Sequence, residues 1–375
     1  MKGVASGGEL WYYHSMKTTE LTTEEVLSAF GQRLLPWFYQ AARDLPWRHT
    51  DDPYAIWVSE IMLQQTRVAA VLGYYDRFLA AFPTVEALAE APEERLMKLW
   101  EGLGYYSRVR NLQKAAQVIV SQHGGVFPAD YAAIRALPGV GDYTAGAVAS
   151  ICFDRPTPAV DGNVLRVLAR VTEDPSPVTK QSVKKSYELL LRPVYEENPG
   201  SRGELTQALM ELGACVCVPN GAPKCALCPL QGFCRAEMNG SWDTLPVKEA
   251  KKPRRQEQLT VFFLSCGSRY AVRRRPDTGL LAGLWELPNT EGTLTAQQAL
   301  SLLEQWGLQP EQLQKVIERT HVFTHVEWHM RCCYVRVAEP GGDFTWVDGA
   351  EFSRSIALPT AFRMFWEPED GQAEK

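Results

Sequence analysis

Nine cysteines occur in this sequence of 375 residues, and several of them are crowded into one short stretch. Cys225, Cys228 and Cys234 have the spacing C-x2-C-x5-C, and seven residues separate Cys217 from Cys225. Four thiolates at such close spacing could bind either a tetrahedral Zn²⁺ ion or a [4Fe–4S] cluster. Cys215, two residues before Cys217, is a competing ligand. Unrelated buried cysteines and disulfides are the alternatives, although nothing near the N-terminus resembles a secretory signal.

Two carboxylates have positions that suit acid–base chemistry. Glu60 lies in a helical pattern that begins at Asp52-Pro53, an N-cap followed by proline, and that we expect to continue to Val68. Its side chain leaves this helix among mostly apolar neighbours, and a carboxyl group partly removed from water has a raised pKa and can act as a general acid. A glutamate at the edge of the core whose carboxylate reaches water is the alternative. Asp161 stands before the pattern G-N-V-L-R-V and could cap a helix there.

Glycines at a helical hairpin indicate a backbone site for anions. Residues 131–151 predict a short helix, the turn Pro138-Gly139-Val140-Gly141 and a second helix rich in small residues. Glycine lets the backbone turn tightly and approach a partner, and the amides at the start of the second helix attract anions. A plain connection between two helices is the alternative. The pattern L-P-G-V-G-x-x-T-A favours a helix-hairpin-helix that grips phosphates regardless of base sequence.

The composition is that of an ordinary globular protein with room for two or three domains. Apolar residues make up 45% and charged residues 22% of the sequence, and no apolar run is long enough to span a membrane. The cysteines outside the cluster are scattered, which suits a reducing compartment. A net charge of −5 argues mildly against nucleic acid as a partner, but such binding needs only a local basic face.

Two kinds of periodicity divide the chain near Gln258. Before it the apolar residues have helical spacing, and we expect helices from Thr23 onward and in 68–81, 93–101, 106–122, 182–197 and 204–216. After it the spacing becomes two, which predicts strands in 261–266, 270–274 and 328–337, with a helix at 295–306. The predicted fold class is therefore multidomain, with an all-α part followed by an α+β part.

Several stretches resemble known families. The run E-L-G-A-C-V-C, followed by C-x2-C-x5-C, resembles the iron–sulfur loop of the endonuclease III superfamily of DNA glycosylases. That family's usual spacing is C-x6-C-x2-C-x5-C, and the extra residue here falls in a Pro/Gly loop that can bulge. W-V-S-E-I-M-L-Q-Q-T-R-V, with G-L-G-Y-Y-S-R at 102–108, is similar to the adenine DNA glycosylase (MutY) family. R-R-R-P-x-x-G-L-L-A-G-L-W-E-L-P resembles a Nudix (MutT-like) domain whose acidic hydrolase signature is mostly absent.

The resemblance implies an all-α helix-hairpin-helix glycosylase core with a [4Fe–4S] loop, followed by an α+β Nudix-like domain that recognises the lesion. Met16 is a second possible start of the chain. We expect a loose tail at 1–22, a helical glycosylase domain at 23–240 with its helix-hairpin-helix module at 54–155, a basic linker at 241–258, the Nudix-like domain at 259–366 and a tail at 367–375.

The functional residues of the adenine glycosylases map onto matching positions of this sequence. The resemblance implies that Glu60 is the catalytic acid and that Asp161 faces the sugar, oriented by Tyr143 and Asn163. The other implied sites are the adenine pocket (Trp47, Arg48, Gln207), the DNA contacts (Gln65, Tyr105, Gly139, Val140, Gly141), the 8-oxoguanine contacts (Phe323, Thr324, His325) and the cluster ligands (Cys217, Cys225, Cys228, Cys234).

The implied function is that of a monofunctional glycosylase, which hydrolyses the N-glycosidic bond of adenine mispaired with 8-oxoguanine or guanine in duplex DNA. An oxidised-pyrimidine glycosylase/lyase of the endonuclease III type is the nearest alternative, but those enzymes carry a lysine where Tyr143 stands, and without an amine no Schiff base forms. A thymine–guanine mismatch glycosylase, a non-catalytic DNA-damage binder and an iron–sulfur redox carrier are further alternatives. We expect a monomer without membrane contact, located in the cytoplasm at the nucleoid if the source is bacterial.

Overall fold

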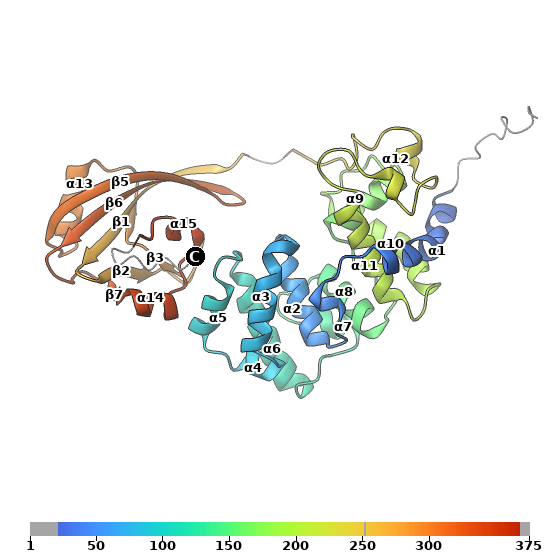
Figure 1. Ribbon diagram of the computed structural model, residues 1–375, viewed down its shortest axis with the longest axis horizontal. Helices are drawn as coiled ribbons and strands as arrows, with labels where there is room; N and C mark the ends of the chain where they lie inside the picture. The colour runs from blue at the N-terminus through green and yellow to red at the C-terminus, as the bar shows by residue number, and fades with distance from the viewer. Residues whose placement is uncertain (1–21, 251–252, 368–375) are drawn as a thin grey trace, which may run out of the picture. The chain divides into compact units, whose positions relative to one another are not determined.

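A computed structural model describes residues 22–250 and 253–367 of the chain, so the two predicted tails lie almost entirely outside the described residues (Figure 1). The described residues form two compact units. The first consists of residues 22–51, 129–136 and 140–249, and the second of residues 52–128, 137–139 and those from 250 onward. Each unit is described by itself.

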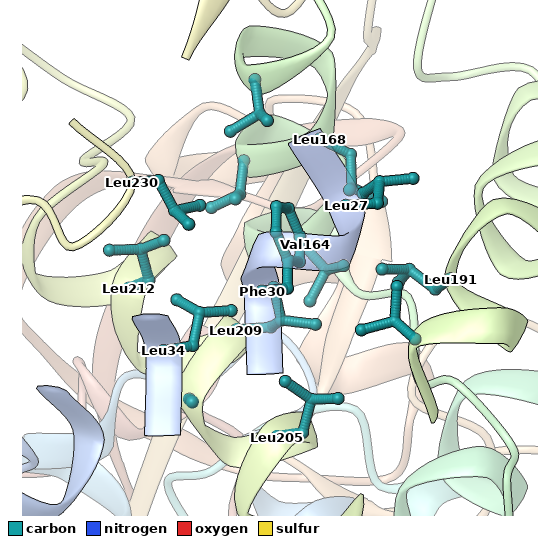
Figure 2. Packing of buried hydrophobic residues seen from close by; sticks show 14 of the residues in the cluster. Leu27, Phe30, Leu34, Val164, Leu168, Leu191, Leu205, Leu209, Leu212 and Leu230 are labelled. Atoms are coloured by element: carbon teal, nitrogen blue, oxygen red, sulfur yellow. The ribbon is translucent and has the colours of Figure 1, made fainter. Parts of the chain in front are cut away.

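The first unit is built from helices that surround one apolar core. Its helices are α1 (Thr23–Ala41), α7 (Tyr131–Arg135), α8 (Asp142–Phe153), α9 (Gly162–Val171), α10 (Gln181–Glu196), α11 (Arg202–Cys215) and α12 (Arg235–Met238), with short 3-10 turns at Pro46–Arg48 and Cys225–Leu227. Leu27, Phe30 and Leu34 recur at helical spacing along α1 and face Leu209 of α11 and Val164 of α9 (Figure 2). This core holds α9 and α11, which carry several of the predicted site residues, in fixed positions.

The helical part of the second unit contains α2 (Pro53–Leu63), α3 (Val68–Ala81), α4 (Val85–Ala89), α5 (Glu93–Trp100) and α6 (Ser107–His123). Helix α2 is buried on all sides from Tyr54 to Met62. It ends at Leu63, so the prediction that this helix continues to Val68 was wrong. The next residues form a loop in which Gln65 has a φ of 57°, a left-handed conformation that no α-helix accommodates.

The C-terminal part of the second unit contains a mixed sheet with the strand order β3-β2-β1-β6-β5, to which β4 and β7 also pair. Its strands are β1 (Arg255–Cys266), β2 (Arg269–Arg274), β3 (Trp285–Glu286), β4 (Asn289–Glu291), β5 (Pro310–Val322), β6 (Val326–Val337) and β7 (Thr345–Asp348). Strands β1 and β6 run parallel, and the other pairs are antiparallel.

Strand β1 is the centre of this sheet, and both of its faces are covered. Val261 and Phe263 pack in one apolar cluster with residues of α14 (Gly349–Ser355) and α15 (Thr360–Arg363). Phe262 and Leu264 pack in another cluster with residues of α13 (Ala296–Gln305). Burial on both faces explains why the strand is a nearly unbroken apolar run. The predicted α+β part is confirmed by this layered arrangement.

The predicted linker and strand β5 differ from the sequence-based expectation. Strand β1 begins at Arg255, inside the stretch expected to be linker, and Leu245 earlier in that stretch is buried, with its carbonyl oxygen accepting a hydrogen bond from Arg170 Nε at 3.0 Å. Strand β5 was not expected at all.

Among the described residues, no helix has the length and apolar character needed to cross a membrane.

Candidate active site

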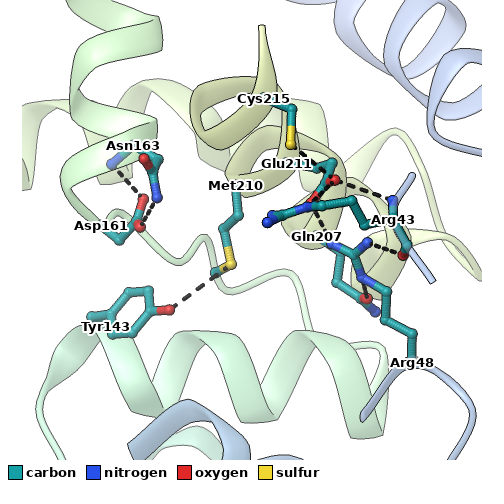
Figure 3. Close-up of polar contacts among 9 residues, drawn as sticks. All are labelled: Arg43, Arg48, Tyr143, Asp161, Asn163, Gln207, Met210, Glu211 and Cys215. Atoms are coloured by element: carbon teal, nitrogen blue, oxygen red, sulfur yellow. Dashed lines mark hydrogen bonds and ion pairs between the residues drawn. The ribbon is translucent and has the colours of Figure 1, made fainter. Parts of the chain in front are cut away.

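Asp161 caps the N-terminus of α9, and three hydrogen bonds fix its carboxylate. Figure 3 shows the contacts between Asp161 and Asn163. Its Oδ1 accepts from the backbone amides of Asn163 and Val164 at 2.9 and 2.8 Å, and its Oδ2 accepts from the Asn163 side-chain amide at 2.8 Å. Burial raises the pKa of Asp161 above that of an ordinary aspartate, and these hydrogen bonds counteract part of that effect. The result is a carboxylate that cannot rotate freely.

Asn163 is itself held by a buried arginine. Arg166 donates from Nη2 to Asn163 Oδ1 at 2.8 Å and to the carbonyl oxygen of Gly213 at 2.7 Å, and from Nε to the carbonyl oxygen of Cys217 at 2.7 Å. A Cβ atom at Gly213 would lie 2.5 Å from Asn163 Cβ, so only glycine lets α11 approach α9 this closely. A continuous set of hydrogen bonds therefore joins Asp161 to the start of the cysteine loop.

Tyr143 lies in the first turn of α8, in the same unit as Asp161. Its hydroxyl donates to the sulfur atom of Met210 on α11 at 3.9 Å (Figure 3). The side chain is partly buried and ends in a phenol. A phenol can donate a hydrogen bond but cannot form an imine.

Arg48 and Gln207, two residues of the predicted adenine pocket, are in direct contact. Arg48 Nε donates to Gln207 Oε1 at 3.1 Å, and Arg48 Nη2 pairs with Glu211 Oε2 at 2.8 Å. Arg43 also pairs with Glu211, at 2.7 and 2.8 Å (Figure 3). Trp47, the third predicted pocket residue, is buried in the neighbouring 3-10 turn.

Sequence analysis missed Glu211 and Arg43, because ion pairs between positions so far apart leave no local pattern. The Glu211 side chain is only 1% exposed. Burial disfavours its charge, yet hydrogen bonds from Arg43 and Arg48 outweigh burial and lower the pKa of Glu211 to about 2. Glu211 therefore carries a negative charge that fixes both guanidinium groups.

The glycine turn before α8 has the geometry of a tight hairpin. Gly139 has a φ of 74°, and a Cβ atom there would lie 2.5 Å from Asn111 Cβ. Gly141 is the N-cap of α8. Because glycine has no side chain, the cap residue accepts no hydrogen bond from the backbone amides at the start of that helix. Arg135 closes the turn by donating to the carbonyl oxygen of Val140 at 2.9 Å. Gly139 therefore favours glycine for steric reasons, whereas a Cβ atom at Gly141 would meet nothing within 4 Å.

Two predicted DNA contacts of the second unit, Gln65 and Tyr105, lie in loops with left-handed backbone, at φ angles of 57° and 47°. Arg108 ties the two loops together, and sequence analysis did not anticipate it. Its Nη1 donates to the carbonyl oxygens of Ile61, Met62 and Gln64, and its Nη2 donates to those of Leu103 and Gly104, at distances of 2.7–3.2 Å. Burial lowers the pKa of Arg108 to about 10, so it remains charged at neutral pH.

Glu60 lies near the C-terminal end of α2, in the second unit, and is 5% exposed. Little of the residue is therefore in contact with water. A carboxyl group surrounded by protein is the setting in which general acids operate.

The four predicted ligand cysteines line one cavity, together with Arg170, Leu212 and Trp242 among others. Burial raises the pKa of the Cys228 thiol to about 12 and that of Cys234 to about 11, and Arg170 Nη1 lies 3.3 Å from Cys217 Sγ. Cys215 does not line this cavity, and its thiol donates to Glu211 Oε1 at 3.3 Å instead. In the described part of the chain, no group of three or more His, Cys, Asp or Glu residues could hold a metal ion as placed.

The three predicted 8-oxoguanine contacts form the turn between β5 and β6. Phe323 packs on Trp328 with ring centroids 4.8 Å apart, and its amide donates to the carbonyl oxygen of Val326 at 2.8 Å. Thr324 and His325 are exposed. The contacts of Phe323 anchor the turn that carries these two polar side chains.

Two families match separate parts of the chain. Residues 58–193 match the HhH-GPD superfamily of base excision DNA repair proteins, and residues 260–368 match the NUDIX domain. The chain is 35% identical to the adenine DNA glycosylase of Mus musculus over 411 aligned positions, which cover 92% of this chain and 79% of that protein. The chain belongs to the adenine DNA glycosylase family. Its enzyme class is accordingly that of a DNA N-glycosylase, a hydrolase of base excision repair, as the sequence motifs predicted.

Other relatives of this glycosylase agree. The adenine DNA glycosylase of Homo sapiens is 35% identical, with 92% of this chain and 75% of that protein covered. The adenine DNA glycosylase of the bacterium Buchnera aphidicola subsp. Acyrthosiphon pisum is 29% identical, with 82% of this chain and 87% of that protein covered. Among solved structures, a thermostable thymine-DNA glycosylase superposes with a TM-score of 0.51 at 29% identity, over 58% of this chain and 99% of that one. The predicted fold, a helix-hairpin-helix core followed by a Nudix-like domain, is thus confirmed.

Proposed function

We propose that this glycosylase releases adenine mispaired with 8-oxoguanine or guanine in duplex DNA, by hydrolysis of the N-glycosidic bond. The observation that carries the proposal is the Asp161 carboxylate, held by three hydrogen bonds and backed by Asn163 and Arg166. A fixed negative charge of this kind stabilises the oxocarbenium-like sugar that forms when a glycosidic bond breaks. The target adenine must leave the base stack to reach it.

Glu60 is the acid of the proposed reaction. Its buried carboxyl group would donate a proton to adenine N7, which turns the base into a neutral leaving group. Asp161 would remain ionised and face the sugar. One carboxyl group would donate a proton and the other, ionised, would stabilise the sugar, as the two carboxyl groups of glycoside hydrolases do.

Tyr143 is the reason to propose a monofunctional enzyme. Its phenol would orient Asp161 together with Asn163, and it offers no amine that could attack the sugar and cleave the strand. The flipped adenine would stack on Trp47 and meet the polar groups of Arg48 and Gln207, which the contact between their side chains holds in place. Gln65 and Tyr105 would wedge into the duplex, and Gly139, Val140 and Gly141 would bind a phosphate through backbone amides.

Four cysteine thiolates around one pocket suit either a [4Fe–4S] cluster or a zinc ion. The resemblance of the cysteine spacing to the iron–sulfur loop of the endonuclease III superfamily favours the cluster. Cys217, Cys225, Cys228 and Cys234 would hold the cluster, which supplies electron-transfer chemistry when bound. The protein's own residues still perform base release, and the Arg166 contact to the Cys217 carbonyl would stiffen the support of Asp161.

A panel of duplexes tests the proposed substrate. Base release would be measured under single-turnover conditions on duplexes with adenine opposite 8-oxoguanine, adenine opposite guanine, thymine opposite guanine, and thymine glycol opposite adenine. We expect release from the two adenine mispairs, faster opposite 8-oxoguanine. Release of thymine or thymine glycol at a greater rate would instead support a mismatch thymine glycosylase or an endonuclease III-type enzyme, and binding without any release would support a damage-binding protein.

A further inference from the structure

One end of the helical part of the second unit is joined to the C-terminal segment 352–363 by a group of polar contacts. Lys98 on α5 donates to the carbonyl oxygen of Ile356 at 2.9 Å, and its ammonium group lies 5.3 Å from the centre of the Phe352 ring. Phe352 and Ile356 are buried, so these contacts lie at the edge of the apolar core of the Nudix-like domain.

Glu101 is the centre of this group, since one carboxylate meets three partners. Its Oε1 accepts from the backbone amide of Leu358 at 2.9 Å and pairs with Arg363 Nη1 at 2.7 Å, while its Oε2 pairs with Lys98 at 2.8 Å. The side chain is 11% exposed. A carboxylate with so little contact with water depends on these three partners for its solvation.

Glu101 is also the residue from which the wedge loop, residues 102–106, begins. It is the C-cap of α5, and its carbonyl oxygen accepts a hydrogen bond from the Tyr74 hydroxyl at 2.7 Å. Gly102 follows with a φ of 99°, and a Cβ atom there would lie 2.3 Å from the Tyr74 hydroxyl. Trp100 closes the loop by donating to the carbonyl oxygen of Gly104 at 3.0 Å. The conformation of the loop is thus set from the backbone of Glu101 onward.

The far end of the wedge loop meets the lesion-contact turn. The Tyr105 hydroxyl lies 3.0 Å from Thr324 Oγ1, close enough for a hydrogen bond. The loop that would carry the wedge tyrosine is therefore in contact with the Nudix-like domain at both ends, through the Glu101 carboxylate at its start and through the Tyr105 hydroxyl near its end.

We propose that Glu101 is a positioning residue that couples the Nudix-like domain to the wedge loop. When the turn at Thr324 engages 8-oxoguanine, the Nudix-like domain is held in place on the DNA. Its Leu358 amide and Arg363 side chain then hold the Glu101 carboxylate. Glu101 in turn fixes the wedge loop in the conformation that supports adenine release. This inference rests on the proposed function and adds to it a route by which the base opposite the adenine affects the rate. Coupling of this type changes a rate or an affinity by about fivefold to a hundredfold.

The test is the preference of full-length Glu101→Gln for 8-oxoguanine over guanine. An amide of the same shape can still accept from the Leu358 amide, but it loses the charge that pairs with Lys98 and Arg363. We expect the ratio of single-turnover rates, adenine opposite 8-oxoguanine over adenine opposite guanine, to fall by about fivefold or more. The rate on the guanine mispair should stay within about twofold of the wild type, because the proposed coupling acts only when the turn at Thr324 engages 8-oxoguanine.

Arg274→Gln is the matched control. Arg274 pairs with Glu94 at 3.0 Å, so it also joins α5 to the Nudix-like domain, but at the other end of the helix and without a contact to the wedge loop. The ratio of the two single-turnover rates for Arg274→Gln should equal the wild-type ratio. Arg363→Gln, at a half-exposed position, should lower the ratio in the same direction as Glu101→Gln, and the double variant should lower it no further.

The outcomes separate this inference from the proposed function. A wild-type protein that releases no adenine, or shows no preference for 8-oxoguanine, would contradict the proposed function itself. A wild-type preference that Glu101→Gln leaves unchanged would overturn the coupling alone. An equal loss in Glu101→Gln and Arg274→Gln would also overturn it, since general loosening of the domain contact would then explain both.

Discussion

At the scale of single residues, the proposed function assigns the lack of strand cleavage to Tyr143. A lysine amine could attack the sugar and form a Schiff base, whereas a phenol cannot. We predict that the wild-type protein leaves the strand intact at neutral pH, and that Tyr143→Lys gains weak strand cleavage and becomes trapped on DNA by borohydride. Tyr143→Phe controls for trapping by other lysines. Strong strand cleavage by the wild type at neutral pH would place the enzyme in the bifunctional class.

Glu211 makes stability depend on pH in a defined direction. Its pKa in the folded protein is about 2, against 4.5 for an ordinary glutamate, so its ion pairs stabilise the fold fully above pH 4.5 and are lost as the pH falls toward 2. We predict that Glu211→Gln is less stable than the wild type at pH 6, by up to about 3 kcal/mol in the free energy of unfolding. The difference should shrink at pH 3. Urea unfolding at both pH values measures it, and a difference independent of pH would exclude the ion pairs as its source.

At the scale of elements, the cysteine loop distinguishes Cys217 from Cys215, only two residues apart. Cys217 lines the cavity with the other three cysteines, whereas the Cys215 thiol contacts Glu211. We predict about four iron atoms per chain, a yellow-brown colour and little zinc in the purified protein. Cys217→Ser should lower the iron content, and Cys215→Ser should not. Equal loss of iron from both variants, or zinc in place of iron, would show that the ligands are assigned wrongly.

Element boundaries followed from the sequence where local signals decide them, and failed where distant residues do. Thr22 caps α1 with Glu25, a pattern visible within four residues, and the helix begins at Thr23 as predicted. Helix α2 ends early because Arg108, more than forty residues away, binds the carbonyl oxygens of its last turn. Strand β5 was missed because it is an edge strand with few buried side chains, so apolar alternation is weak along it.

The same distinction holds for the site. Asp161, Asn163 and the cysteines lie within short motifs, and their residue types could be read directly from the sequence. Arg43 and Glu211 pair across the fold, and Arg108 contributes by its hydrogen bonds to backbone carbonyls, which any sequence offers. Supporting residues of this kind become recognisable only when the folded backbone brings their partners together.

At the scale of the whole molecule, the Nudix-like domain is proposed to read the base opposite the adenine. Thr324 is exposed in the turn between β5 and β6, and its hydroxyl could bond the N7–H or O8 of 8-oxoguanine. We predict that Thr324→Val lowers the preference for 8-oxoguanine over guanine by about fivefold, the value of one hydrogen bond. Thr324→Ser, which keeps the hydroxyl, should retain the preference. A valine variant with wild-type discrimination would remove Thr324 from the proposed reading surface.

In the proposed mechanism, Glu60 is the general acid that allows the N-glycosidic bond to break. The most direct measurement is the single-turnover rate of adenine release by Glu60→Gln on a duplex with adenine opposite 8-oxoguanine, together with its affinity for that duplex. An amide keeps the shape of the buried side chain but cannot donate the proton, so the rate should fall by about 100- to 10,000-fold while binding is largely preserved. A variant that releases adenine at nearly the wild-type rate would contradict the assignment.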